Sequence, residues 1–216
     1  LIQLKREDGA GALLHLDRLE AAPMTSPAER IFWQGRGAGL RGRALELLGK
    51  KAAARTAHLK AVEIWEQWQL LGLRPEARAE AFIFAAQSLL ALGERGRAID
   101  TLERAVDAQP ERKETYADVL ALLTTDGLLP EALDAYHRAL GRSEVNEYLK
   151  AYCSFWVLDL ERRAGLPPDP LAIAYLERLR GDQWYVRIAE LVLGKIDYPT
   201  LLAAAKSAGN RAEAHY

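Results

Sequence analysis

The sequence contains very little of what disulfide-stabilised or metal-binding proteins need. It has one cysteine, Cys153, and four histidines in 216 residues. A single cysteine excludes an internal disulfide framework and a cysteine-based zinc site. No two histidines stand four residues apart, as two ligands of a helical zinc site would. The sequence therefore predicts no metal site and no cofactor. Cys153 stands among apolar residues, which predicts a buried, inert thiol.

Long apolar runs and an excess of charge of one sign are missing as well. The longest uncharged run near the middle, residues 81–93, is too short to cross a bilayer. The 29 Lys and Arg residues nearly balance the 30 Asp and Glu residues, and the net charge of -1 disfavours nucleic acid as a partner. We expect a soluble protein of the cytoplasm or periplasm. The compartment stays open because the chain begins at Leu1 rather than at methionine.

Catalytic motifs are also absent, which predicts that the protein is not an enzyme. The segment Gly37-Ala-Gly39-Leu-Arg-Gly42 matches the dinucleotide pattern G-x-G-x-x-G, but a helical pattern precedes it where that motif requires a strand. Two interpretations remain for its glycines and for Gly35. They either let another helix approach closely or break a long helix into two, and either role leaves this stretch dependent on tertiary contacts.

What the sequence does contain is an internal repeat of 34 residues. Segment 82–105 matches segment 116–139 at this single offset, with side-chain size kept at most positions. The matched pairs are Phe82 with Tyr116, Ala85 with Val119, Leu89 with Leu123, Gly93 with Gly127, Ala98 with Ala132, Ile99 with Leu133, Leu102 with Tyr136 and Ala105 with Ala139. Within each copy the apolar residues recur at three- and four-residue steps, which predicts two short helices joined at the glycine.

This pattern resembles the tetratricopeptide repeat of bacterial helical-repeat proteins. Phe82, Ala86, Gly93, Ala98 and Ala105 stand where that family has its aromatic, small and turn residues. The resemblance implies an all-α fold, a right-handed superhelical solenoid of antiparallel helix pairs.

The pattern extends less strictly over the whole chain, which we interpret as one helical-repeat domain and a fragment of a longer protein. Ser26 and Asp169 are expected to cap helices, and Asn210 to cap the last one. The predicted elements are a partial repeat at 1–23, helix pairs at 27–72, 76–110, 113–141, 145–180 and 183–208, and the start of a further helix at 210–216.

Charge and tryptophan mark one region of the chain. Between residues 30 and 60 eight basic residues accompany one acid, Glu46. Two interpretations of these basic residues stay open: they solvate the exterior of a helix, or they contact an anionic partner. Trp65 and Trp68 are expected in the core, although one could anchor a partner. The basic segment comprises Arg30, Arg36, Arg41, Arg43, Lys50, Lys51, Arg55 and Lys60.

The resemblance implies a concave groove lined by the first helix of each pair. Such a groove suits a peptide or a partner helix, so the leading hypothesis is a non-catalytic scaffold or adaptor that binds protein. The alternative is a helical arm or sensor region of a larger enzyme or regulator, and a weaker alternative is an anionic-partner binder that uses residues 30–60. The oligomeric state is left open. The groove residues carried over from the family are Glu80, Ile83, Gln87, Leu90, Glu114, Ala117 and Thr124.

Overall fold

The computed structural model describes residues 8–20, 26–69, 71, 74–109, 113–143 and 145–214. These ranges contain twelve α-helices and no strand, which confirms the predicted all-α fold for the described part of the chain. The chain divides into two compact units, Leu1–Pro110 and Glu111–Tyr216, which we describe separately. The predicted end of the partial repeat at residue 23 and the predicted end of a helix pair at residue 110 lie outside the described residues.

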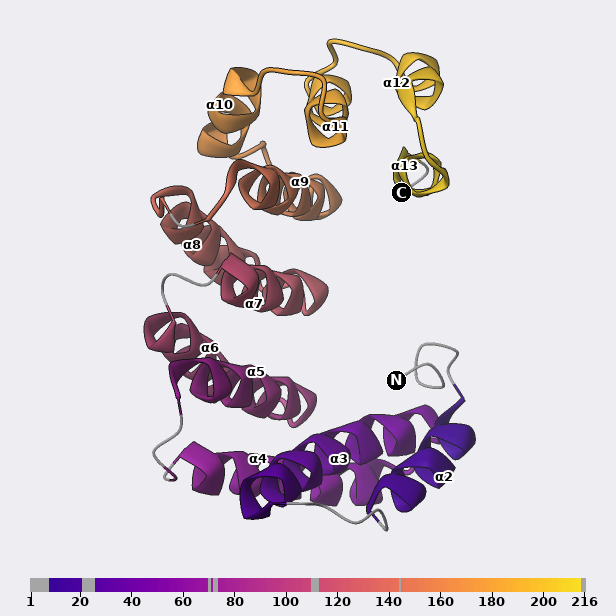
Figure 1. The fold of residues 1–216 in the computed structure, drawn as a ribbon, viewed down its shortest axis with the longest axis vertical. Helices are drawn as coiled ribbons and strands as arrows, with labels where there is room; N and C mark the ends of the chain where they lie inside the picture. Colours follow the sequence, from indigo (N-terminus) through magenta and orange to yellow (C-terminus); the bar gives the residue numbers. More distant parts are fainter. Residues whose placement is uncertain are drawn as a thin grey trace. The chain divides into compact units, whose positions relative to one another are not determined.

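The first unit is a row of helices in which each one packs against the next along the chain (Figure 1). Helix α3 also contacts α5, so three helices meet around its middle. The helices of this unit are α2 (Gly9–Glu20), α3 (Pro27–Leu47), α4 (Lys51–Gln69), α5 (Pro75–Ala91) and α6 (Arg95–Ala108).

Helix α3 begins where the sequence predicts and runs through all of its glycines. The Ser26 hydroxyl accepts the backbone N–H of Glu29 at 3.1 Å, and Pro27 occupies the first turn. Gly35, Gly37 and Gly42 are buried in one unbroken helix. Of the two interpretations, the helix break is wrong, and close approach is confirmed at Gly35 and Gly42, where an added side chain would collide with Trp65 and His58.

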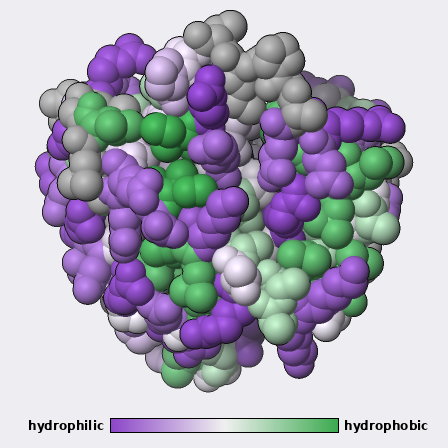
Figure 2. All heavy atoms as spheres, turned by 90° about the horizontal axis from the view of Figure 1, so that it is seen from below, coloured by the Kyte–Doolittle hydropathy of each residue, from purple (hydrophilic) through white to green (hydrophobic). Residues whose placement is uncertain are grey.

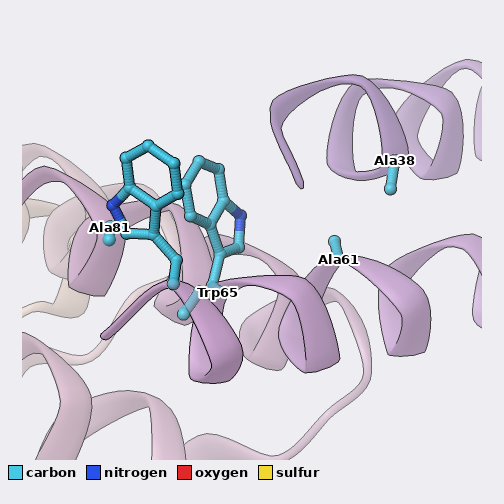
Figure 3. Close-up of a cluster of buried hydrophobic side chains, with 6 residues drawn as sticks. Ala38, Ala61, Trp65 and Ala81 are labelled. Carbon is cyan, nitrogen blue, oxygen red and sulfur yellow. The ribbon is translucent and has the colours of Figure 1, made fainter. Parts of the chain in front are cut away.

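The contact between α3 and α4 shows why small residues are needed there. In Figure 3 Ala38 of α3 and Ala61 of α4 point toward one another, and both are buried. A side chain on Gly35 would come within 2.8 Å of the Trp65 ring. Trp65 and Trp68 are themselves core residues, as expected, with ring centroids 6.2 Å apart and edges toward faces.

The 34-residue repeat corresponds to two similar helical hairpins, α5–α6 and α7–α8. Gly93 and Gly127 end the first helix of each hairpin with φ of 77° and 68°, a conformation that suits glycine. Ala98 and Ala132 are the first residues of the buried faces of α6 and α8, and both are fully buried. The helical repeat is thus present in the structure, while the superhelical twist that the resemblance implies stays a prediction.

The second unit continues the pattern of successive packed helices. The Asp169 carboxylate caps α10 by accepting the backbone N–H of Ala172 at 2.8 Å, as predicted. Gly165, with φ of 69°, ends α9. The helices are α7 (Lys113–Thr125), α8 (Leu129–Leu140), α9 (Glu147–Ala164), α10 (Pro170–Arg178), α11 (Trp184–Val192), α12 (Tyr198–Ala204) and α13 (Ala208–Ala214).

Two further predictions about the second unit have different outcomes. The cap at Asn210 is wrong, because Ser207 accepts the backbone N–H of Asn210 at 3.0 Å and the helix begins at Ala208. Cys153 is fully buried in α9, and burial raises the pKa of its thiol to about 12, so it is inert as expected. Within the described residues, no helix has the length and apolar character to cross a membrane.

Candidate functional site

The predicted groove residues of α5 differ in how much of their surface is accessible. Glu80 is exposed, whereas Gln87 and Leu90 are half-buried. Ile83 is only 6% exposed, because it lies on the face of α5 that packs into the core. A partner on this helix would therefore contact Glu80, Gln87 and Leu90 and almost nothing of Ile83.

Arg36 of α3 is the residue that connects the predicted basic segment with the predicted groove. One of its guanidinium nitrogens, Nη1, donates to Gln87 Oε1 at 3.4 Å. Its guanidinium carbon lies 3.9 Å from the centroid of the Phe84 ring, in a cation–π contact. Arg36 and Gln87 are 51 positions apart in the sequence, and the packing of α3 on α5 brings them together.

The electrostatics of this arrangement keep Arg36 charged in a partly desolvated place. Burial lowers the pKa of Arg36, Glu80 raises it and Arg43 lowers it further. The guanidinium stays protonated at neutral pH all the same, because arginine does not lose its proton in proteins. Arg36 has five N–H donors, and its hydrogen bond to Gln87 is long, so donors are left for a carboxylate or a carbonyl group.

A small pocket lies beneath Arg36, between α3, α4 and α5. It encloses about 20 Å³, which is room for roughly one water molecule. His58 lines the pocket and is 2% exposed, and neither ring nitrogen makes a hydrogen bond within the described structure. The residues around it are Gly35, Arg36, Gly39, Leu40, Arg43, His58, Trp65, Phe84, Gln87 and Ser88.

The surroundings of His58 disfavour the charged form of its ring. Burial lowers the pKa of the ring, and the positive charge of Arg43 lowers it further, while the Glu46 carboxylate raises it. Glu46 Oε1 lies 3.3 Å from His58 Nε2, but it is not aligned for a hydrogen bond, so we regard it as a weak partner.

The other predicted basic residues lie in two different settings. Arg41 is neutralised by α2, because its Nη2 lies 2.7 Å from Asp17 Oδ1 and 3.0 Å from Glu20 Oε1. The remaining six are exposed, and the described part of the chain shows no ion pair for them. These six are Arg30, Arg43, Lys50, Lys51, Arg55 and Lys60. On the face drawn in Figure 2, hydrophilic and hydrophobic residues are interspersed.

The predicted groove residues on α7 belong to the second unit. Glu114 is exposed, and Ala117 and Thr124 are half-buried. The Thr124 hydroxyl donates to the backbone oxygen of Leu120 at 2.7 Å, so its hydrogen-bonding capacity is largely used within its own helix. Of these three residues, only Glu114 is exposed.

We call Arg36, Phe84 and Gln87, together with the pocket beneath them that His58 lines, the α3–α5 site. Two of its residues, Phe84 and His58, were not predicted from the sequence. Phe84 belongs to an apolar run in which every position fits a core stripe, and His58 carries no motif. Their roles follow from the packing of α3 on α4 and α5, for which the sequence has no direct signal. Within the described residues, no group of three His, Cys, Asp or Glu side chains is placed to hold a metal ion.

Comparison with known protein families gives a match that covers this site. Residues 36–145, just over half of the chain, match the family described as the bacterial transcriptional activator domain. Comparison with curated proteins gives no matching relative. The tetratricopeptide prediction is therefore supported as a helical repeat and not as that family itself. The chain belongs to the bacterial transcriptional activator domain family.

Proposed function

We propose that the chain is the partner-binding helical region of a bacterial transcriptional regulator and that it acts without catalysis. The observation that carries the proposal is the family match, which starts at Arg36 and contains the whole contact between Arg36, Phe84 and Gln87. It favours the alternative of a regulator's helical arm over a free-standing scaffold. A regulatory rather than catalytic family also supports a protein that is not an enzyme.

The α3–α5 site has the chemistry of a protein-binding surface. Arginine and aromatic residues are enriched among the residues that dominate binding energy in interfaces. Arg36 is fixed over Phe84 before any partner binds, so little side-chain freedom is lost on binding. Glu80 and Gln87 flank it with an acceptor and an amide. We infer that a partner segment with a carboxylate or exposed backbone carbonyls docks here.

The test uses the regulator in its host with the substitutions Arg36→Ala and Phe84→Ala. Transcription of its target promoters is measured together with cross-linking of the partner from a photoreactive residue at position 91, an exposed position of α5 one turn from Gln87. Each substitution is expected to lower both by about tenfold, the effect of losing about 1.4 kcal/mol at a central contact.

The matched control is Arg95→Ala, which removes an exposed arginine of α6 that belongs to neither candidate binding surface. It is expected to leave transcription and cross-linking unchanged. Thermal melting must show that the Arg36 and Phe84 variants stay folded at the assay temperature. If folded Arg36→Ala protein still activates transcription and cross-links fully, the α3–α5 site is not the binding surface.

A second candidate function is contact with an anionic partner at the turn between α3 and α4. Lys50, Lys51 and Arg55 are exposed on neighbouring positions there. The net charge of the chain disfavours nucleic acid as a partner, whereas membership of a transcriptional activator family makes DNA a partner worth testing. Binding to duplex DNA should weaken steeply with salt and in the Lys50→Glu, Lys51→Glu double variant. Salt-independent binding would exclude this role.

A further inference from the structure

A cluster of aromatic residues covers one face of the second unit, outside the residues that the family match covers. Tyr148 and Tyr152 of α9 lie with ring centroids 4.6 Å apart, and Tyr185 of α11 meets Tyr148 edge to face at 5.8 Å. Phe155 extends the cluster along α9, 5.6 Å from Tyr152. Tyr148 is 51% exposed. Exposed aromatic rings with polar tips are the side chains most used in protein-binding surfaces.

Two hydrogen-bond donors of this face converge on a single carboxylate oxygen. The Tyr152 hydroxyl donates to Glu213 Oε2 at 3.0 Å, and the Trp184 indole Nε1 donates to the same oxygen at 2.6 Å. The indole N–H can only donate, so it needs an acceptor. Donors from α9 and α11 thus form a site for a carboxylate, and in this structure Glu213 of α13 occupies it.

Helix α13 itself is weakly attached to the rest of the unit. None of its described residues, Ala208–Ala214, is buried. Figure 1 shows it beside α12, and its Glu213 side chain is hydrogen-bonded to one residue of α9 and one residue of α11. It covers the donor pair and leaves Tyr148 exposed.

The negative charge of Glu147, next to the aromatic cluster, determines which hydrogen-bond donors of the cluster can bind a carboxylate. Glu147 already accepts the Tyr185 hydroxyl at 2.7 Å through its side chain. The Tyr175 hydroxyl donates to the Glu147 backbone oxygen at 3.1 Å. Those two donors are therefore used, and the Glu147 charge would repel a second carboxylate. Tyr152 and Trp184 are the donors that an incoming acid can reach.

We propose that the aromatic face of α9 and α11 is a docking site for an acidic peptide segment of a partner protein, with apolar side chains next to its carboxylate, and that this segment replaces α13. Glu213 acts as the internal competitor. The partner's acidic residue takes the hydrogen bonds of Tyr152 and Trp184, and its apolar neighbours cover Tyr148 and Phe155.

The test measures binding of a fluorescein-labelled peptide of residues 206–216 to the full chain by fluorescence anisotropy. The Glu213→Gln chain should bind this peptide at least about fivefold more tightly than the wild type, because its internal competitor is weaker. A peptide with the same Glu213→Gln change should bind at least about fivefold more weakly than the acidic peptide. Equal affinity in either comparison would overturn the proposal.

Matched substitutions in the Glu213→Gln chain test the face itself. Tyr152→Phe removes a donor to the carboxylate and should weaken binding of the acidic peptide. Tyr185→Phe removes a hydroxyl of the same cluster that serves Glu147, so it should leave binding unchanged. If Tyr185→Phe weakens binding as much as Tyr152→Phe, the peptide does not use the assigned donors.

Two further measurements distinguish a docking site from which α13 can be displaced from a surface to which α13 stays bound. A peptide with leucine in place of Ala212 and Ala214 should bind more tightly than the native peptide, and no gain would contradict the apolar part of the proposal. Amide hydrogen exchange of residues 208–214 should be faster in the Glu213→Gln chain, and unchanged exchange would contradict release of α13. All these variants lie beyond residue 145, so their failure would leave the α3–α5 proposal untouched.

Discussion

His58 shows how one residue's surroundings determine its ionisation. Its ring packs against the backbone of Gly42, so closely that no side chain fits at that glycine, and it has almost no contact with solvent. Protonation would place a charge in this space with only Glu46 to offset it. Burial is therefore the main reason why the pKa of His58 lies below its ordinary value of 6.5.

This lowered pKa predicts that acid destabilises the protein through His58. In the unfolded chain the ring binds a proton as the pH falls through about 6.5, whereas the folded protein resists protonation. The unfolded state then holds more protons, so the free energy of unfolding is full above pH 6.5 and falls below it, by at most about 1.4 kcal/mol per pH unit. Urea titrations at pH 7.5, 6.5 and 5.5 measure this.

The variants His58→Gln and His15→Gln isolate the effect. His15 is exposed on α2, so its replacement should leave the pH dependence as in the wild type. His58→Gln removes the titrating group and should flatten the dependence between pH 7.5 and 5.5. A slope in the His58→Gln variant equal to that of the wild type would show that another group causes the loss of stability.

At the scale of the element, α3 depends on glycines that touch neighbouring helices. A methyl group on Gly35 would lie 2.8 Å from Trp65 Cε2 and 3.1 Å from Ile64 Cγ2, and one on Gly42 would collide with the His58 ring. Gly96 in α6 has nothing within 4 Å of the same position. Replacing glycine by alanine is therefore expected to destabilise the protein at Gly35 and Gly42 and to stabilise it at Gly96.

Gly35→Ala and Gly42→Ala should each lower the free energy of unfolding by about 1–3 kcal/mol, because rigid rings must shift. Gly96→Ala should raise it by about 0.5–1 kcal/mol, since alanine favours the helix and meets no neighbour. Chemical denaturation of the three variants measures the differences. If all three are stabilised, the glycines of α3 serve helix propensity alone and not close packing.

The element scale also shows what could be predicted from the sequence. Ser26, Asp169 and the turn at Gly93 were predictable because caps and turns depend on neighbours within a few residues. The role of the glycines in α3 stayed open, because it depends on a helix that follows 16 or more residues later. Gln87 was predicted as a groove residue by resemblance, but its bond to Arg36 required the packing of α3 on α5.

At the scale of the whole molecule, the family match and the compact units divide the chain differently. The match runs from Arg36 in α3 to Val145 before α9, and so takes helices from both units. The compact units separate after Pro110. A family domain and a folding unit need not coincide in a row of helices, because each helix is stabilised mainly by its neighbours.

The first unit, Leu1–Pro110, should therefore fold when produced alone. Its central core is complete within it, since Trp65, Trp68, Ala38 and Ala81 pack together there with Phe32 and Phe84 beside them. We expect the fragment to show helical far-UV circular dichroism, a near-UV tryptophan signal and a cooperative melt. Trp65→Ala removes a side chain that is 1% exposed and should cost about 3–5 kcal/mol, enough to unfold it. A fragment without near-UV signal, or one whose melt ignores Trp65→Ala, would show that the core needs residues beyond Pro110.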